Sequence, residues 1–156
     1  MPGPYRWMTW VAVILLSAAG CDRPEDPPTP PKQKHKSALQ VVVPAGVKAK
    51  WKAVKIAVWD KATNQETVYA IEIGSDFPIP ESKLRIKVLS FLPAFIMDGK
   101  SISSISNETT NPAAQVTVSE GEKILFIGWL FSLYPMTHSF QHPRFSFTLV
   151  GSLPAG

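Results

Sequence analysis

Apolar and polar residues alternate one by one along much of the chain after residue 38, a pattern typical of β-strands. The clearest case is KLRIKVLSF, residues 83–91, which places leucine, isoleucine and valine on one face and lysine and arginine on the other. The segments TVYAIEI (67–73) and RFSFTLV (144–150) follow the same rule. This pattern predicts a domain built almost entirely of strands.

The stretch GVKAKWKAVKIAVWD, residues 46–60, follows the β-branched run LQVVV and is predicted to be a long strand. Its alternation reverses phase partway along. Because a shift of one residue moves every later side chain to the other face, we expect a β-bulge or bend at residues 52–53.

A hairpin is predicted from QVTV, a Ser-Glu-Gly-Glu turn and KILFIGWLF, which together cover residues 115–131. Both faces of the last segment are apolar. Such a strand is either covered on both sides or leaves apolar surface exposed. Gly128 within it indicates a bulge or a close approach of other atoms.

The predicted fold class is all-β. We expect residues 39–156 to form a single small sandwich or partly open barrel of about seven to eight mostly antiparallel strands. Only residues 135–142 suggest a helix, and this predicts one short helical turn near the C-terminus. The stretch 99–114 has no clear period, so we expect a recognition loop or a segment folded back onto the domain.

The first twenty residues have the layout of a secretory signal peptide. Arg6 supplies a positive start, an apolar run follows at residues 8–16, and small residues precede Cys21. The apolar run is too short for a permanent membrane span. Residues 1–20 are therefore predicted to be a cleaved signal.

Cys21 is the only cysteine in a chain of 156 residues with net charge +4. Its position after Ala-Ala-Gly resembles the lipobox of bacterial lipoproteins, in which the cysteine becomes the acylated mature N-terminus, carrying fatty acyl chains such as palmitate. The alternative is an ordinary cleaved signal with an incidental cysteine. Asp22 resembles a signal for retention in the inner membrane, but the choice between inner and outer membrane stays open.

Residues 22–38, DRPEDPPTPPKQKHKSA, are rich in proline and charge and include no large apolar residue. They cannot form a packed core. Residues 21–38 are therefore predicted to be an acylated cysteine followed by a semi-rigid tether, extending about 3 Å per residue.

Four motifs in order carry a resemblance to a known family: VKAKWKAVKIAVWDKATNQ, FLPAFIMDG, SNETTNPA and GWLF…P…HPRF. They resemble an uncharacterised family of bacterial envelope proteins, the domain-of-unknown-function family 2155, over about residues 45–150. The resemblance implies a secreted, mainly β domain. It supplies no catalytic residues.

His138 and His142 are four residues apart, the spacing that lets two imidazoles share a zinc ion on one helical face. Pro143 disfavours helix at His142, and no second cysteine offers a further ligand. These histidines are weak metal candidates, and we predict no metal and no cofactor.

No catalytic motif is present: the chain has neither a G-x-S-x-G elbow nor a serine–lysine motif. We predict that the protein is not an enzyme. The basic faces at 48–52 and 83–87 could meet anionic headgroups, or they could simply cover the wet side of a sheet. A nucleic-acid partner is not expected outside the cytoplasm.

The aromatic residues Trp129, Phe131, Tyr134 and Phe140 are a candidate binding patch or part of the core. The predicted protein is a non-catalytic lipoprotein of the bacterial cell envelope, facing the periplasm or the exterior and held in the membrane by acylated Cys21. It is predicted to act as a binding or assembly module for another envelope protein. The alternatives are a periplasmic carrier of an apolar ligand in a small barrel and, after it, a metal-dependent enzyme.

Overall fold

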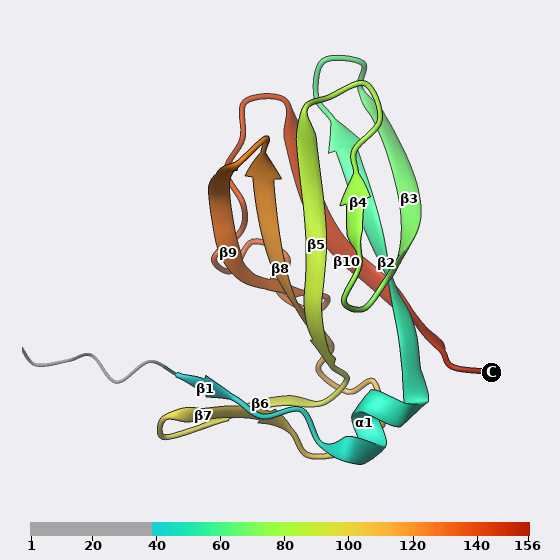
Figure 1. Cartoon of the computed structure of the whole chain (residues 1–156), viewed down its shortest axis with the longest axis vertical. Helices are drawn as coiled ribbons and strands as arrows, with labels where there is room; N and C mark the ends of the chain where they lie inside the picture. Colours follow the sequence, from blue (N-terminus) through green and yellow to red (C-terminus); the bar gives the residue numbers. More distant parts are fainter. Residues whose placement is uncertain (1–38) are drawn as a thin grey trace, which may run out of the picture. The chain divides into compact units, whose positions relative to one another are not determined.

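The computed structural model describes residues 39–156, which lie within one compact unit of the chain (Figure 1). Within that range the chain forms ten strands and one short helix, so the all-β prediction is confirmed. The predicted signal peptide, Cys21 and the tether lie outside the described residues. The elements are β1 (Gln40–Val41), α1 (Ala45–Lys50), β2 (Trp51–Asp60), β3 (Gln65–Glu72), β4 (Asp76–Pro78), β5 (Leu84–Leu92), β6 (Phe95–Asp98), β7 (Ser101–Ser104), β8 (Ala113–Glu120), β9 (Lys123–Phe131) and β10 (Phe145–Pro154).

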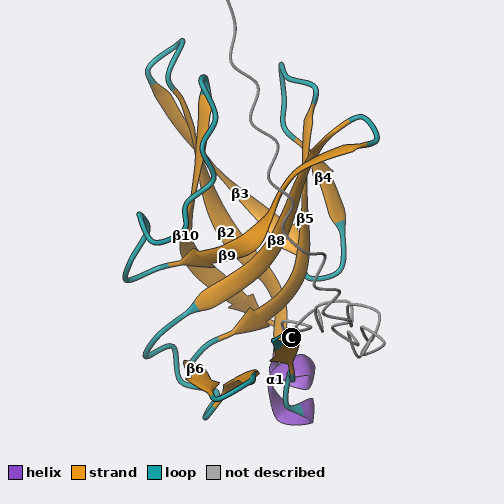
Figure 2. Cartoon of the chain, turned by 90° about the vertical axis from the view of Figure 1, so that its left-hand side faces the viewer, coloured by secondary structure: helices purple, strands orange, loops and turns teal. Residues whose placement is uncertain are grey.

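The strands form three sheets (Figure 2). One has the order β10-β2-β3 and the second β4-β5-β8-β9, with antiparallel pairing throughout. The third, here called the small sheet, has the order β1-β7-β6, and its β1 runs parallel to β7. The two larger sheets face each other as a sandwich and do not close into a barrel.

The core lies between the two larger sheets because their strands place apolar residues on one face only. In β5, Leu84, Ile86 and Val88 are buried while Lys87 is exposed, as the alternation predicted. The core takes apolar residues from β2, β3, β5, β8, β9 and β10. Its largest fully buried side chains include Phe91, Ile56, Ile71, Ile86, Leu92 and Leu149.

The predicted strand at 46–60 is correct only from Trp51 onward, since residues 45–50 form α1. The carbonyl of Pro44 accepts the amides of Val47 and Lys48, and Val47 is the one buried side chain of this helix. The lysines of α1 stay exposed, so the local alternation reflects solvation and not a sheet face. A register shift opposite Leu153 and Pro154 leaves Lys52 as an extra residue, which confirms the expected irregularity at 52–53.

The short helix near the C-terminus was predicted wrongly. Residues 135–138 form only a turn, in which the amide of Thr137 donates to the carbonyl of Tyr134. His138 has a φ of 51°, in the left-handed region, so a right-handed helix cannot continue through it. Among residues 39–156, no helix has the length and apolar character needed to cross a membrane.

The stretch 99–114 is ordered. It contains β7, which pairs with β6 through a turn at Gly99, where φ is 55°. Beyond β7, the side chain of Asn107 accepts a hydrogen bond from Trp51 Nε1 (3.2 Å) and donates one to the carbonyl of Gly46 (3.2 Å). Of the two expectations, the segment therefore folds back onto the domain and joins the small sheet to α1 and β2.

Replacing Phe91 by alanine tests the core. Phe91 is 1% exposed and its ring meets Trp51 edge-on at 5.4 Å between centroids. Phe91→Ala is expected to lower the free energy of unfolding by about 3–5 kcal/mol, measured by urea denaturation. The control Leu89→Ala, on the same strand but exposed, should change it by less than about 1 kcal/mol. Equal losses in the two variants would contradict this assignment of the core.

Candidate functional site

β9 is the last strand of its sheet, with β8 as its only hydrogen-bonded neighbour within residues 39–156. β10 comes close to β9 but belongs to the other large sheet and is not paired with it. The outer side of β9 therefore presents unpaired backbone groups. Such an edge is a template on which another extended chain can pair.

A bulge and a glycine shape β9. The register shift between Val118 and Ser119 leaves Leu125 as the extra residue of the strand. On the core side, the Phe126 ring lies over Gly128, and a Cβ added to Gly128 would stand 2.4 Å from its Cζ. The predicted close approach at Gly128 is thus confirmed, and it comes from a side chain two residues earlier on the same face.

The outer face of β9 is apolar. Ile124 and Ile127 pair with Ser119 and Thr117 of β8, and both isoleucines are more than half exposed. The segment that follows β9 continues this character, with large apolar residues more than half exposed: Leu133, Tyr134 and Met136. We call these five residues the β9 surface. Large apolar residues exposed together along one strand and its continuation are typical of a binding surface.

The four aromatic residues of the candidate patch fall into three separate surroundings. Trp129 and Phe131 are half-buried, and each ring meets Phe95 of β6 edge-on, at 5.3 and 5.1 Å between centroids. Phe140 is 5% exposed and stacks on Phe147 at 5.3 Å, so it belongs to the core. Only Tyr134 of the four lies on the β9 surface.

The two histidines play different parts. His142 Nδ1 accepts the backbone amides of Arg144 (3.2 Å) and Phe145 (3.1 Å), which fixes the approach to β10. His138 is exposed on the turn after β9. Among the described residues no three His, Cys, Asp or Glu side chains gather as metal ligands would.

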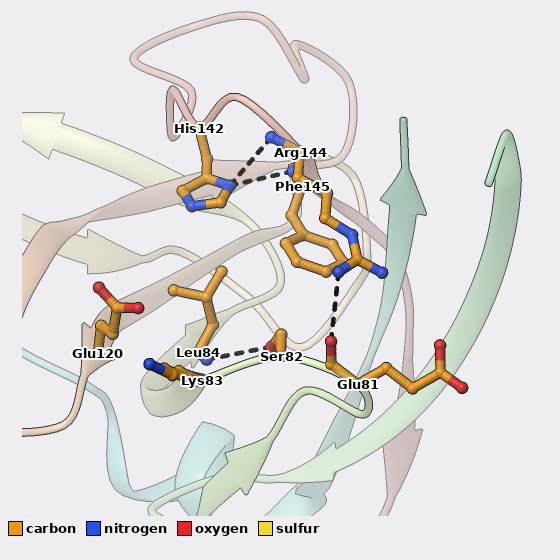
Figure 3. Close-up of a pocket in the computed structure, with 8 residues that line it drawn as sticks. All are labelled: Glu81, Ser82, Lys83, Leu84, Glu120, His142, Arg144 and Phe145. Atoms are coloured by element: carbon orange, nitrogen blue, oxygen red, sulfur yellow. Dashed lines mark hydrogen bonds between the residues drawn. The ribbon is translucent and has the colours of Figure 1, made fainter. Parts of the chain in front are cut away.

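An open hollow of about 520 Å³ lies at the start of β5 and β10 (Figure 3). It is lined by charged side chains together with apolar ones, and His142 stands at its rim. Arg144 donates to the carbonyl of Glu81 at 3.3 Å across it. Of its polar groups, Ser82, His142 and Arg144 are already hydrogen-bonded within the protein, and the hollow is open to solvent.

Arg144 also donates two hydrogen bonds to the Asp60 carboxylate, from Nε to Oδ1 at 2.9 Å and from Nη2 to Oδ2 at 2.6 Å. The Asp60 side chain is 16% exposed. This hydrogen bonding by Arg144 lowers the pKa of Asp60 to about 2, against the opposing effect of desolvation. The same pair raises the pKa of Arg144. The pair joins the end of β2 to the start of β10.

A second hollow, of about 450 Å³, lies beside α1. Val47, Ile73 and Phe91 contribute apolar lining, while Lys48 and Lys52 contribute positive charge. Lys52 is paired with Glu72 at 3.2 Å. The predicted basic face 48–52 is therefore divided between a helix and a strand.

Of the basic face predicted at 83–87, Arg85 and Lys87 lie on one side of β5, and Lys83 comes just before the strand. Arg85 pairs with Asp76 at 2.9 Å, and both side chains are close to half exposed. Its charges are thus partly neutralised by the neighbouring strand β4.

Comparison of the chain with protein-family models, curated proteins and solved structures gives no match. The resemblance to an uncharacterised envelope family therefore stays a prediction.

The Asp60–Arg144 pair should make stability depend on acid. Because the pKa of Asp60 is lower in the folded state than in the unfolded chain, its contribution is present above about pH 4 and is lost as the pH falls towards about 2. Asp60→Asn should be less stable at pH 7 and lose less stability between these pH values. Arg144→Gln should show the same two effects. The free energy of unfolding of each variant is measured by urea denaturation at each pH. An unchanged acid dependence in both variants would contradict the role given to the pair.

Proposed function

We propose that this protein is a non-catalytic, lipid-anchored protein of the bacterial envelope that binds another envelope protein by pairing a strand with the edge of β9. The observation that carries the proposal is an unpaired edge strand with exposed isoleucines on its outer face. In strand addition, backbone hydrogen bonds supply affinity and the alternate side chains supply specificity.

The sandwich has three other edge strands, β3, β4 and β10. β3 and β4 are protected in familiar ways. β10 carries no charged residue but differs from β9 in exposing a single large apolar residue, Val150. β4 is short and ends in Pro78. β3 carries charged residues such as Glu66 and Glu72 on exposed positions. β9 has one charged residue, Lys123, at its start, and apolar residues follow for the rest of its length.

The membrane anchor and the envelope location come from the sequence: an apolar signal, Cys21 directly after it, and a proline-rich tether. The non-catalytic proposal is supported by the hydrogen bonds that the candidate polar groups already make within the protein. His142 Nδ1 is occupied by two backbone amides, and Asp60 is occupied by Arg144.

A second candidate is a carrier of a small apolar ligand, favoured by the hollow beside α1. Native mass spectrometry of protein purified from its own cells separates it from the first. Extra mass from a small molecule, lost in Val47→Asp, would favour the carrier. A protein without added mass would favour the partner-binding module.

Changing the edge of β9 should weaken partner binding without unfolding the protein. Ile127 is 61% exposed, so Ile127→Lys costs little stability, while a lysine on an edge strand disfavours further pairing. With a photo-crosslinking residue at 124, we expect a discrete protein adduct in the producing cells. Ile127→Lys should reduce its yield about tenfold.

The matched control is Val68→Lys, on the edge strand β3, where Val68 is 51% exposed. It should leave the adduct unchanged. Equal yields in Ile127→Lys and the unchanged protein, or no adduct at all, would contradict binding at β9.

The proposed acylation of Cys21 can be tested separately from partner binding. The mature protein should begin at Cys21 and carry the mass of fatty acyl chains, because several buried chains hold a protein stably in a bilayer. Cys21→Ser should release it from the membrane fraction, as judged by mass spectrometry and fractionation. A mature chain without acyl mass would exclude the lipoprotein assignment.

A further inference from the structure

The chain enters the described domain at the small sheet. From residue 39 it passes into β1. The Gln40 amide donates to the carbonyl of Lys100, just before β7, and the Val42 amide donates to that of Ile102 on β7 (both 2.8 Å). The small sheet and α1 lie together at one end of the domain (Figures 1 and 2). The N-terminal segment of the chain is therefore joined covalently to the domain at this end.

One face of the small sheet is turned away from the sandwich. Phe95 points to the sandwich, because its ring contacts Trp129 and Phe131. Since side chains alternate along a strand, Ile96 and its partner Ser103 lie on the opposite face. Val42, whose carbonyl accepts the Ser103 hydroxyl, is exposed, and so is Ile105, two residues beyond Ser103. We call this face, together with α1, the entry face.

Positive charge surrounds the entry face. Lys48 and Lys50 are exposed on α1, and Lys100 is exposed on the turn between β6 and β7. Asp98, two residues after Ile96 on β6, lies on the entry face itself, and Glu108 lies beyond β7. The sequence just before the domain contains lysines at positions 32, 34 and 36. Among the described residues named here, three lysines stand against two carboxylates.

The opposite end of the sandwich lacks this excess. Its turns and strand ends carry acidic and basic residues in nearly equal number: Asp60, Lys61, Glu66, Glu81, Lys83, Glu120, Glu122, Lys123 and Arg144. Counted over these described residues, the entry end has one net positive charge and the opposite end one net negative charge.

We infer that the entry face lies against a membrane surface of anionic lipid, with Val42, Ile96 and Ile105 at headgroup level and the lysines beside the phosphates. This rests on the proposed anchor: acylated Cys21 would keep the entry face within a tether's length of the bilayer, at high effective concentration. Exposed aliphatic residues with lysines around them match both components of such a surface. The β9 surface would remain free for its partner.

The test uses the full acylated chain in vesicles of phosphatidylglycerol and phosphatidylcholine, compared with vesicles of phosphatidylcholine alone. An environment-sensitive fluorophore is attached at Ile105→Cys or, as control, at Val68→Cys on β3. Acylation leaves Cys21 unreactive. Spin-labelled lipids should quench the fluorophore at 105 in the anionic vesicles and leave the one at 68 in water.

A charge-reversal pair provides the second arm. Lys48→Glu with Lys50→Glu should lower the ratio of membrane-contacting to free orientations by about tenfold or more. Lys83→Glu with Lys123→Glu, the same charge change at the opposite end, should leave it unchanged. High salt should weaken the quenching at 105 because it screens the lysines.

The outcomes distinguish failure of the entry-face inference from failure of the proposed lipid anchor. An acylated chain with equal quenching at 105 and 68, or with equal effects of the two charge-reversal pairs, would overturn the entry-face inference alone. A chain without acyl mass that leaves the vesicles would overturn the anchor and, with it, this inference.

Discussion

Mutual burial of the inner faces of the two large sheets is the interaction on which the remaining structure depends. Ile56 of β2, Ile86 of β5 and Val116 of β8 are fully buried in this one cluster. Because side chains alternate along a strand, only every second residue of a strand points into this core. The remaining residues face solvent or a further layer of the protein. β9 lies at the edge of this arrangement. Its inner face joins the core through Leu130 and Phe126. Within residues 39–156, no further layer covers Ile124 and Ile127 on its outer face.

The small sheet shows how a second layer is made where one exists. Phe95 packs on Trp129 and Phe131, so the end of β9 nearest β6 is covered. Asn107 ties the same region to Trp51 and Gly46. The cover does not reach Ile127, and the apolar outer face is therefore divided into a buried part and an exposed part. This division separates the proposed partner surface on β9 from the proposed membrane surface on the small sheet and α1.

Period-two alternation was enough to predict the all-β class, the inward residues of β5 and the hairpin of β8 and β9, because burial on one face leaves a direct mark on the sequence. The irregularity at Lys52 was also visible, as a change of phase. α1 was missed because lysines alternating with small residues look alike on a solvated helix and on an exposed strand face. Only the start after Pro44, which is compatible with a helix N-terminus, favours the helix.

The candidate site was predicted in part. The two apolar faces of KILFIGWLF raised the alternative of an exposed surface, but no local signal distinguishes an edge strand from a central one. Aromatic residues drew attention to Phe140, which long-range packing on Phe147 buries, while the exposed isoleucines were passed over. Edge position depends on which strands pair, and pairing is a property of the whole sandwich.

The central claim is that β9 is open in the free protein and paired in its complex. Residue-resolved hydrogen exchange of the purified protein, and of the complex isolated with it, tests this most directly. The account predicts that the amides of β9 not bonded to β8 exchange rapidly in the free protein and become protected in the complex, while those of β3 do not change. Protection of these amides in the free protein, or unchanged exchange in the complex, would contradict it.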